Sequence, residues 1–552
     1  MGKLFDFFRN IFEYKEKFDY DFVLSNGNTE PNENISDITE TVSSSYDYNI
    51  ELIKTKYSTL INSDIKIREF NLNFQNKQYK SFIFYIDGMI NSDSINRFVL
   101  SPLMSNISSY KNSNVQNSNK VSIIKNSDIS SYIIDSLLPQ NDITQSNKFS
   151  EIFSLVNLGN TALFIDSVPY CFLIDAKGFD KRSIPVPENE FVIRGSQEGF
   201  IETVRTNTSL LRRLINNENL IIESASVGKI NKNTVCICYM KNIANSDLVN
   251  EVKYRVNNLD IDYIISSGEL EQFITDKQFG IPQMISTERP DRVANYLLDG
   301  RVALIVNGTP YVLVAPAVFS DFLTSSEDRN LQYQFSNLLR LIRAIALVIT
   351  LILPGFYISI TTFHQELIPT ELLFAIVSTR SSVPFPIIFE IILMDLSLEL
   401  IRESGVRVPA PMGQTIGIVG GLILGDAAVS ADIVSPILII VVAITGLTAF
   451  AVPDYSLGFH IRIARLFYIF AGYFAGFFGL AFAMFIHLGM LASINSFGVS
   501  YLSPYAPFSV SKSESYILGP IWKRERRDSF LNTKLKDKEG HISMKWKGFV
   551  GK

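Results

Sequence analysis

The sequence predicts a multi-domain protein: a mixed α/β (α+β) N-terminal soluble region of two subdomains, followed by an α-helical transmembrane bundle of four to six helices. One observation is a change in composition. The first half of the 552 residues is dense in Lys, Asn and Ser, whereas no lysine occurs between Lys277 and Lys512. The other is a set of largely uncharged apolar runs from residue 344 onward, each close to the ~20 residues that cross a bilayer as a helix. The mean hydropathy of +0.17 averages these two parts.

Charge and motif content exclude several function classes. A net charge of −5 and a pI near 5.6 argue against a nucleic-acid-binding protein, which needs a basic face. Three cysteines, Cys171, Cys236 and Cys238, are too few for a disulfide framework and are expected to be small apolar strand residues in a reducing compartment. The chain has no GxxxxGKS/T phosphate loop, HExxH, CxxC pair or GxSxG elbow. We therefore expect no enzymatic activity, no cofactor and no metal site.

Local patterns divide the chain into five regions. Apolar residues in the first 12 positions are spaced as in an amphipathic helix, which would dock on its own domain or rest on a membrane surface. Residues 24–47 lack apolar periodicity, which predicts a flexible arm. The predicted regions are the helix and arm (1–47), a first soluble subdomain (48–150), a second soluble subdomain (151–335), a helical transmembrane domain (336–510) and a basic C-terminal tail (511–552).

Both soluble subdomains are expected to combine helices with β-hairpins. In the first, the strand-like runs 65–74 and 81–89 precede a helix around 92–104. In the second, a hairpin pattern surrounds Pro169, and a hairpin with an Asn-Gly turn occupies 303–316. The other elements expected there are a helix at 203–216, strands at 220–228 and 234–241, and a helix at 247–258. Helices mixed with hairpins, without regular βαβ units, favour the α+β mixture.

Four apolar runs are firm candidates for membrane spans, and a fifth run is interrupted. Arg380, Pro384 and Pro386 break the fifth run, at 371–401. The firm candidates are 344–363, 413–431, 433–452 and 466–491.

The flanking basic residues predict the orientation. Because Arg340 and Arg343 precede the first span, the positive-inside rule places the soluble region in the cytoplasm. The number of crossings and the side of the basic tail stay open. A return segment within 493–518 would bring the tail to the inside.

Regularly spaced glycines mark helix faces suited to close packing. Small residues four apart let helices approach closely in lipid. Two interpretations stay open: packing within one chain, or contact between the subunits of a protein that must assemble to work. The glycines are Gly413, Gly417, Gly421 and Gly425 in the second candidate span, and Gly472 and Gly476 in the last one.

Three acidic residues in the interrupted span are candidates for an ion path. On a helix here, Asp395 and Glu399 share one face with Arg402, whereas Glu390 lies off that face. Charged side chains at membrane depth are costly and point to function, so several copies of this face could line a water-filled pore. The alternative is that 395–402 emerges into the cytoplasm, where such charges need no explanation.

One soluble motif, residues 186–215, carries glycines and charges in a distinctive pattern. Gly195 and Gly199 bracket a polar turn that contains Arg194 and Glu198. This pattern predicts a tight interdomain or intersubunit turn held by an ion pair between Arg194 and Glu198. The alternative is that Arg194 binds the carboxylate or phosphate of a ligand.

Four stretches of the chain carry a specific resemblance. They are YIDGM (85–89), VPENEFVIRGSQEGFIETV (186–204), STERPDRVANYLLDGRVALIVNGTP (286–310) and a stretch at 368–465 that begins IPTELLFAIVSTRSSVPFPIIFE. In them the chain resembles the A subunits of the GerA-type spore germinant receptors, over nearly its whole length from about residue 60 to 490.

The resemblance implies a protein of the inner membrane of the dormant endospore. A subunits of this family act with a transporter-like B subunit, which binds the nutrient, and with a lipoprotein C subunit. They are thought to form a pentameric, ligand-gated cation channel whose opening starts germination. The partners implied are further copies of this chain, the B and C subunits, membrane lipid and monovalent cations, with no nucleic acid.

The chain departs from the family pattern at two places. Ser196 and Gln197 stand where the family usually has Pro and Arg, which puts in doubt any anion contact assigned to that Arg. The segment 327–330, Glu-Asp-Arg-Asn, lacks the aromatic pair that the family has before the first span.

Two alternatives to a receptor subunit remain. One is the stage V sporulation paralogue of the A subunit, acting as an accessory ion channel. The other is a nutrient transporter subunit, which the absence of an internal membrane repeat disfavours. The sequence names neither the nutrient nor the ion.

Overall fold

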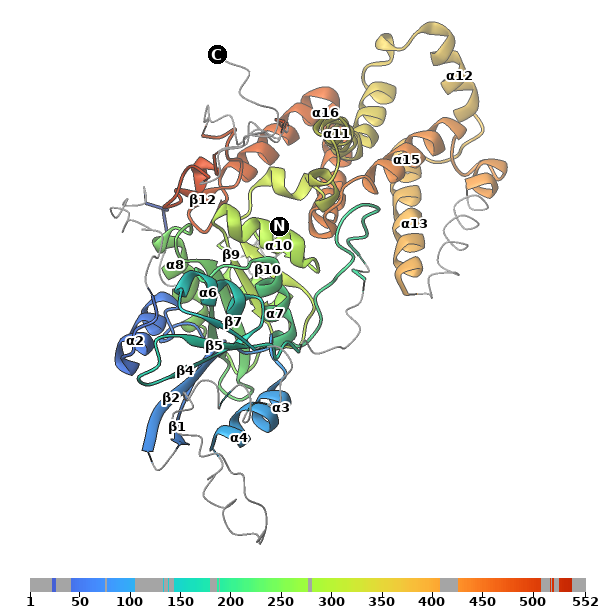
Figure 1. Ribbon diagram of the computed structural model, residues 1–552. Coiled ribbons are helices and arrows are strands. Elements are labelled where there is room, and N and C mark those ends of the chain that lie inside the picture. The colour runs from blue at the N-terminus through green and yellow to red at the C-terminus, as the bar shows by residue number, and fades with distance from the viewer. Residues whose placement is uncertain are drawn as a thin grey trace, which may run out of the picture.

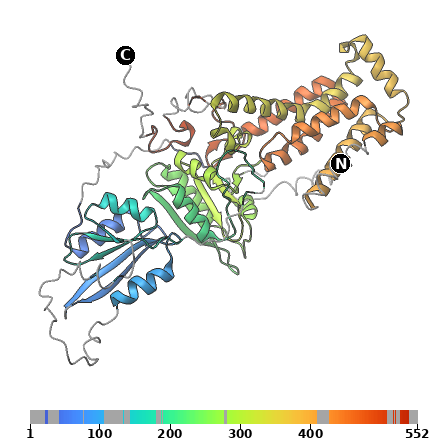
Figure 2. The same cartoon turned by 45° about the vertical axis from the view of Figure 1, so that its right-hand side comes forward.

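Two soluble α/β units and a region of apolar helices follow one another along an elongated molecule, as Figures 1 and 2 show. The computed structural model of the chain describes residues 22–25, 41–74, 77–104, 143–178, 189–276, 280–407, 425–507 and 526–538, with a few positions between these ranges.

The first unit has three layers around an antiparallel sheet with the strand order β1-β2-β4-β5-β3. Side chains alternate between the faces of the sheet, so each face has its own apolar core. Helices α2 (Tyr46–Lys56) and α6 (Phe149–Asn157) cover one face, and α3 (Ser92–Ile95), the π-turn η1 (Asn96–Leu100) and α4 (Ser101–Met104) cover the other. The strands are β1 (Ile65–Phe74), β2 (Lys77–Ile86), β3 (Ile143–Ser146), β4 (Thr161–Ile165) and β5 (Cys171–Ile174).

The second unit has the same three-layer arrangement, with the strand order β6-β7-β9-β10-β8. Helices α7 (Val204–Leu214) and α10 (Pro290–Asp299) cover one face, and α8 (Ser246–Asn257) and α9 (Ser267–Ile274) cover the other. The strands are β6 (Leu220–Val227), β7 (Asn233–Met240), β8 (Ile285–Thr287), β9 (Val302–Val306) and β10 (Val312–Ala315).

The second unit repeats the first in topology, register and sequence. Ala162 lies opposite Leu173 in the β4–β5 pair, as Ala303 lies opposite Val314 in the β9–β10 pair. A glycine with positive φ, Gly159 or Gly300, follows α6 and α10 and precedes the pair of strands. The matching sequences are Gly-Asn-Thr-Ala-Leu (159–163) with Gly-Arg-Val-Ala-Leu (300–304), and Pro-Tyr (169–170) with Pro-Tyr (310–311). The soluble region is therefore a tandem duplication, which the predicted domain pattern did not include.

A buried ion pair joins the two units. Arg212 on α7 donates from Nε and Nη2 to the two carboxylate oxygens of Asp64, at 2.8 and 2.9 Å. The two side chains are 2% and 9% exposed. Asn62 Oδ1 also accepts from Arg212 and from the backbone N–H of Ile222 on β6. Separating such a pair would leave an uncompensated buried charge, so it fixes the contact between the units.

The helical region contains two described helices that are long and apolar enough to cross a membrane, α11 and α16. The predicted bundle of four to six spans is thus not confirmed, and most of the predicted span 413–431 lies outside the described residues. The interrupted run divides at Pro384 and Pro386, as predicted. The helices are α11 (Tyr333–Thr362), α12 (Thr370–Arg380), α13 (Ile387–Arg407), α15 (Pro436–Ala449) and α16 (Tyr455–Ala492).

Helix α16 turns back on itself at Gly476. The backbone there has φ 58° and ψ −139°, a conformation that glycine reaches without strain. The two arms contact each other: Nε2 of His460 lies 3.0 Å from Nε2 of His487, whose Nδ1 lies 3.2 Å from the hydroxyl of Tyr468. The residues of the predicted span 466–491 therefore belong to two antiparallel arms and do not form one straight helix.

The second arm returns the chain to the second soluble unit. There the short strands β11 (Asn495–Ser496) and β12 (Val499–Ser500) follow, and Ser496 Oγ donates to the carbonyl of Gln283. Farther along, the N–H of Lys534 donates to the carbonyl of Ile243 at 3.0 Å. The tail residues 526–538 thus lie beside the second unit, and the chain reverses at Gly476, ahead of the segment 493–518 in which a return was considered.

Two predicted boundaries are wrong. The limit at 150/151 would separate β4 and β5 from their own sheet, because β4 pairs with β2 and the first unit continues through β5. Local patterns do not reveal which distant strands pair. The predicted arm is also too long, since α2 begins at Tyr46 and the N–H of Val42 donates to the carbonyl of Asn147.

Candidate functional site

A buried carboxylate anchors the first long helix to the second soluble unit. Asp328 lies in η5 (Ser326–Arg329), a turn between β10 and α11, and its side chain is fully buried. Its carboxylate accepts from Nε of Arg340 at 3.0 Å and from Nη1 of Arg343 at 2.8 and 2.9 Å. The two arginines that predict the orientation are thus both held by one acidic side chain. Asp328 had no predicted role, although it lies in the segment that departs from the family pattern.

The motif at 186–215 begins with a loop that is fastened to a buried arginine. Arg289, just before α10, donates from Nη1 to the carbonyl of Glu190 at 3.1 Å and from Nη2 to the carbonyl of Ser196 at 2.8 Å. Its side chain is 0% exposed, and its charge is balanced by Asp291 at 2.9 Å. Arg289 belongs to the STERPDR stretch of the resemblance, which was the only sequence signal for this role.

The predicted ion pair between Arg194 and Glu198 is wrong. Glu198 pairs with Arg213 on α7 instead, and the carbonyl of Arg194 accepts from Nδ2 of Asn330 at 3.0 Å. The segment is not helical, so side chains four residues apart do not share a face. Gly195 allows this contact, because a Cβ there would lie 2.7 Å from Asn330 Nδ2.

This contact joins the turn to the segment that leads into α11, and its interdomain or intersubunit role stays a prediction. Asn330 lies three residues before α11, so the turn joins the second unit to the start of that helix. Gly199, the other predicted glycine, is buried beside Phe200.

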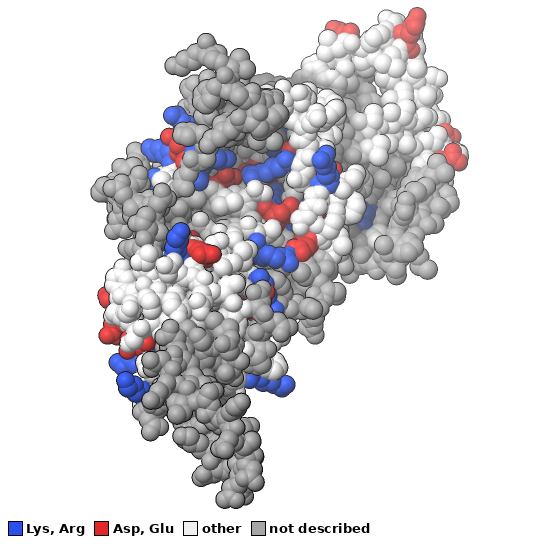
Figure 3. Space-filling view, in the orientation of Figure 1, with Lys and Arg blue, Asp and Glu red and all other residues white. Residues whose placement is uncertain are grey.

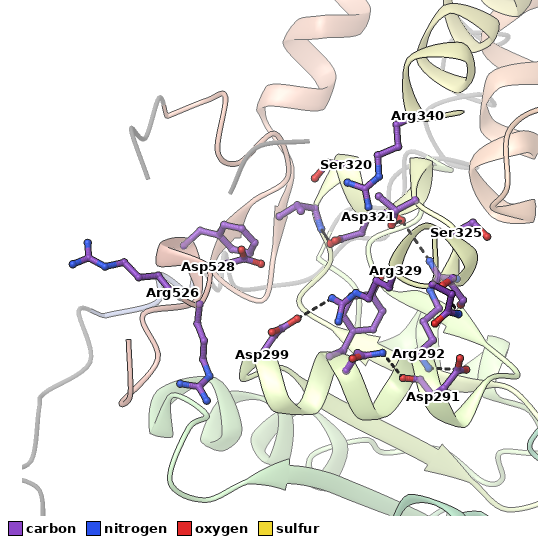
Figure 4. A pocket seen from close by; sticks show the side chains of 18 of the residues that line it. Asp291, Arg292, Asp299, Ser320, Asp321, Ser325, Arg329, Arg340, Arg526 and Asp528 are labelled. Carbon is purple, nitrogen blue, oxygen red and sulfur yellow. Dashed lines mark hydrogen bonds and ion pairs between the residues drawn. The ribbon is translucent and has the colours of Figure 1, made fainter. Parts of the chain in front are cut away.

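A pocket opens where α10, the segment before α11 and the C-terminal tail meet (Figure 4). Its volume is about 220 Å³. Charged side chains gather around it, whereas the face of the helical region that Figure 3 shows is largely uncharged. Arg329 reaches across to Asp299 at 3.0 Å, an ion pair drawn in Figure 4.

Buried arginines support the wall of this pocket. Arg301, 2% exposed, holds the carboxylate of Asp321 with bonds of 2.6 and 3.0 Å. Arg292 pairs with Glu190. Burial alone would lower the pKa of Arg292, but Tyr296 and Glu190 beside it raise that pKa. These guanidinium groups are therefore charged and fixed.

Comparison of the two units shows whether the fold itself requires these arginines. The positions of Arg292 and Arg301 in the second unit correspond to Glu151 and Asn160 in the first. Both units form the same sheet, so the sheet does not need the arginines. The arginines belong to the junction with the helices.

The predicted ion-path carboxylates lie on α13 and face arginines of α16. Asp395 Oδ1 lies 2.5 Å from Nη2 of Arg465, and Glu399 pairs with Arg462 and, at 3.3 Å, with Arg402. Their side chains are 13% and 40% exposed. The shared face of these residues is as predicted, and their role in conduction stays a prediction.

Glu390 lies apart from this face, as expected. It is completely buried, and its Oε2 accepts from the N–H of Ser435 at 3.1 Å. Its Oε1 lies 3.6 Å from Arg380, in α12.

The glycines of the last predicted span pack within the chain. A Cβ on Gly472 would lie 2.6 Å from the carbonyl oxygen of Gly355 on α11. Gly476 packs on Phe363 and His364 at the far end of α11.

The structure describes only one of the four glycines of the second candidate span. Gly425 is described, and a Cβ added there would be in ordinary contact with Ile439; Gly413, Gly417 and Gly421 lie outside the described residues. The role of these glycines in assembly stays a prediction.

The three cysteines are buried strand residues, as predicted. Burial raises the pKa of Cys171, Cys236 and Cys238, so these thiols are not activated nucleophiles. Within the described part of the chain, no cluster of three or more His, Cys, Asp or Glu side chains could hold a metal ion.

Similarity to known proteins decides the family. The family described as "Bacillus/Clostridium GerA spore germination protein" matches residues 51–530. The chain belongs to the GerA family. Of the residues that line the pocket, all but Lys538 lie inside the matched range.

Relatives of this GerA-family chain extend over most of its length. Spore germination protein KA of Bacillus subtilis (strain 168) is 36% identical over 491 residues, which are 89% of this chain and 87% of that protein. Spore germination protein B1 of the same strain is 37% identical over 432 residues, 78% of this chain and 86% of that protein. The crystallised N-terminal domain of the A subunit of the Bacillus megaterium germinant receptor GerK3 is 30% identical, covering 51% of this chain and 98% of that one at a TM-score of 0.37.

Proposed function

We propose that this chain is the A subunit of a nutrient germinant receptor of bacterial endospores and assembles as a pentameric cation channel that opens on nutrient sensing. The observation that carries the proposal is the paired charged face between α13 and α16, with Asp395 and Glu399 on one helix and Arg462 and Arg465 on the other. Charges at membrane depth are costly, and those that occur there usually serve transport or assembly.

The ion pairs suggest how the path is closed. Each carboxylate is matched by a guanidinium of the same chain, so a cation gains little at Asp395 or Glu399 while the pairs hold. Displacement of α16 relative to α13 would release the carboxylates toward the pore. In the closed state the arginines of α16 neutralise the carboxylates of α13. In the open state cations from the solution take their place.

A contiguous set of contacts connects the soluble units to this face. Movement of the η5 turn would pull α11 through Asp328, which holds Arg340 and Arg343. Helix α11 in turn packs on α16 through the Gly355–Gly472 contact. Because α16 carries the arginine partners, a displacement of α11 would reach the ion pairs.

The proposed location is the spore inner membrane, with the soluble units and the basic tail in the cytoplasm. Arg340 and Arg343, which precede the uncharged run of α11, and the basic residues of the tail support this orientation by the positive-inside rule. A relative that is 34% identical over 467 residues is named an uncharacterized membrane protein. The proposed partners are a transporter-like B subunit that senses the nutrient and a lipoprotein C subunit.

Potassium release from spores tests the proposal. Spores that carry Asp395→Ala with Glu399→Ala are expected to release potassium more slowly after nutrient is added, at normal protein levels. A matched control is Glu366→Ala with Glu371→Ala, two exposed acidic residues away from α13, which should leave the release unchanged. Unchanged kinetics in the first variant would remove both carboxylates from the ion path.

A further inference from the structure

Six basic side chains line the pocket at the junction. Four aspartates also line it, but Arg289 and Arg301 neutralise Asp291 and Asp321 from behind the wall. Lys538 makes no ion pair among the described residues. The basic lining residues are Arg292, Arg329, Arg340, Arg526, Arg527 and Lys538.

The wall also includes charges that are already balanced. Four of the six basic lining residues are paired in this way: Arg292 with Glu190, Arg329 with Asp299, Arg340 with Asp328, and Arg526 with Asp537. Hydroxyl groups of the segment before α11, including those of Ser320 and Ser325, also line the pocket. Fixed guanidinium groups present donors in a geometry that suits phosphate oxygens, and nearby hydroxyl groups can add further donors.

The pocket lies at the depth expected for lipid headgroups. Arg340 belongs to α11 itself, and the uncharged run of that helix begins at residue 344, about 6 Å farther along the axis. The polar layer of a bilayer extends about 5–8 Å beyond the hydrocarbon. Basic pockets on the cytoplasmic side of membrane helices bind anionic headgroups.

We propose that this pocket binds a phosphate group, supplied by the headgroup of an anionic phospholipid or by a soluble phosphate ester. The bound phosphate bridges three segments: α10 through Arg292, the turn before α11 through Arg329, and the tail through Lys538. It therefore holds the tail and the start of α11 together on the second unit. The phosphate site is independent of ion conduction, and only its lipid source rests on the proposed membrane position of α11.

Thermal unfolding of the purified full-length chain in neutral detergent tests the site. Inorganic phosphate is titrated at constant ionic strength, and nanodiscs of phosphatidylcholine are compared with nanodiscs that also contain phosphatidylglycerol. In Arg329→Gln with Lys538→Gln, we expect the phosphate concentration for half-maximal stabilisation to rise by about tenfold or more. Arg329→Lys with Lys538→Arg keeps both charges and should retain most of the effect.

A control with the same loss of charge separates the site from general electrostatics. Lys229→Gln with Lys232→Gln removes two positive charges from the exposed β6–β7 turn and should respond like the wild type. Stabilisation by phosphatidylglycerol alone assigns the phosphate to a lipid, and stabilisation by free phosphate assigns it to a soluble ester. The proposal is overturned if neither probe stabilises the wild type, or if the pocket variant and the control respond alike. Because no ion current is measured, this failure is distinct from failure of the channel proposal.

Discussion

Gly472 of α16 lies so close to Gly355 of α11 that a Cβ on Gly472 would be 2.6 Å from the Gly355 carbonyl oxygen. The two backbones are therefore in direct contact at the centre of the helical region. This contact joins the helix that leaves the soluble unit to the helix that carries the arginine partners of α13.

Gly472→Ala is expected to destabilise the protein. The added methyl group must displace the α11 backbone, and overpacking of this kind costs about 1–3 kcal/mol. Gly458→Ala and Gly489→Ala are matched controls in the same helix, because no atom lies within 4 Å of a Cβ at either position. Thermal unfolding in detergent should show a loss only for Gly472→Ala; equal stability of the three variants would contradict the contact.

Asp328→Asn should weaken the connection between the soluble units and α11. The substitution leaves Arg340 and Arg343 without their buried counter-charge, and breaking such a pair costs about 3–5 kcal/mol. Glu327→Gln, one residue earlier, is the control and should be nearly neutral. Hydrogen exchange at the start of α11 would report the loss, and unchanged protection would show that other groups satisfy the two arginines.

The stability of the second unit should depend on Glu271. Burial and then the charge of Asp454 raise the pKa of Glu271 to about 7. The folded state therefore binds more protons than the unfolded state between the ordinary carboxyl pKa and about 7, so stability falls as pH rises through this window. Above pH 7 the free energy of unfolding is lower by about 3 kcal/mol than in acid.

Glu271→Gln should remove this dependence. The variant is expected to be more stable than the wild type above pH 7 and to differ little from it in acid, measured as thermal unfolding against pH. Glu202→Gln, at an exposed position, should keep the wild-type slope. If the stability of the wild type rose between the ordinary carboxyl pKa and pH 7, the raised pKa of Glu271 would be contradicted.

The reversal at Gly476 predicts the topology of the tail. Single cysteines introduced at Arg526 and at Lys229 should react with an impermeant maleimide from the same side of the membrane, and a cysteine at the exposed Leu367 should react from the opposite side. The three native cysteines are buried and give little background. Labelling of Arg526→Cys together with Leu367→Cys would show that α16 does not turn back.

Local patterns predicted many elements closely and long-range relationships poorly. The strands at 65–74, 220–227 and 302–306 and the helix at 204–214 fall where alternation, turn residues and helical spacing predicted them. The break at Pro384 and Pro386 also matches, because proline removes a donor that the helix needs.

The turn at Gly476 could not be predicted from hydropathy. Apolar residues continue through both arms, so the run from 466 to 491 has the composition of one span. Only the positive φ of Gly476 and the facing histidines reveal the reversal. The tandem duplication was detectable in principle, since Ala-Leu and Pro-Tyr recur at corresponding positions, but the first hairpin had been assigned to the wrong unit.

The sequence identified some residues of the candidate site but not the residues that they contact. The carboxylates of α13 were identified from their cost in a membrane, whereas their partners on α16 lie more than 60 residues away and leave no local signal. Arg289 and Asp328 were missed for the same reason. Each acts through backbone or side-chain groups that only the folded chain brings near.

Conductance recording of the purified oligomer in a planar bilayer tests the central claim most directly. The account predicts cation-selective current, with a reversal potential that follows the potassium gradient. It further predicts weaker selectivity in Asp395→Asn with Glu399→Gln. Folded wild-type oligomers that carry no current even with nutrient and partner subunits present, or that select anions, would contradict it.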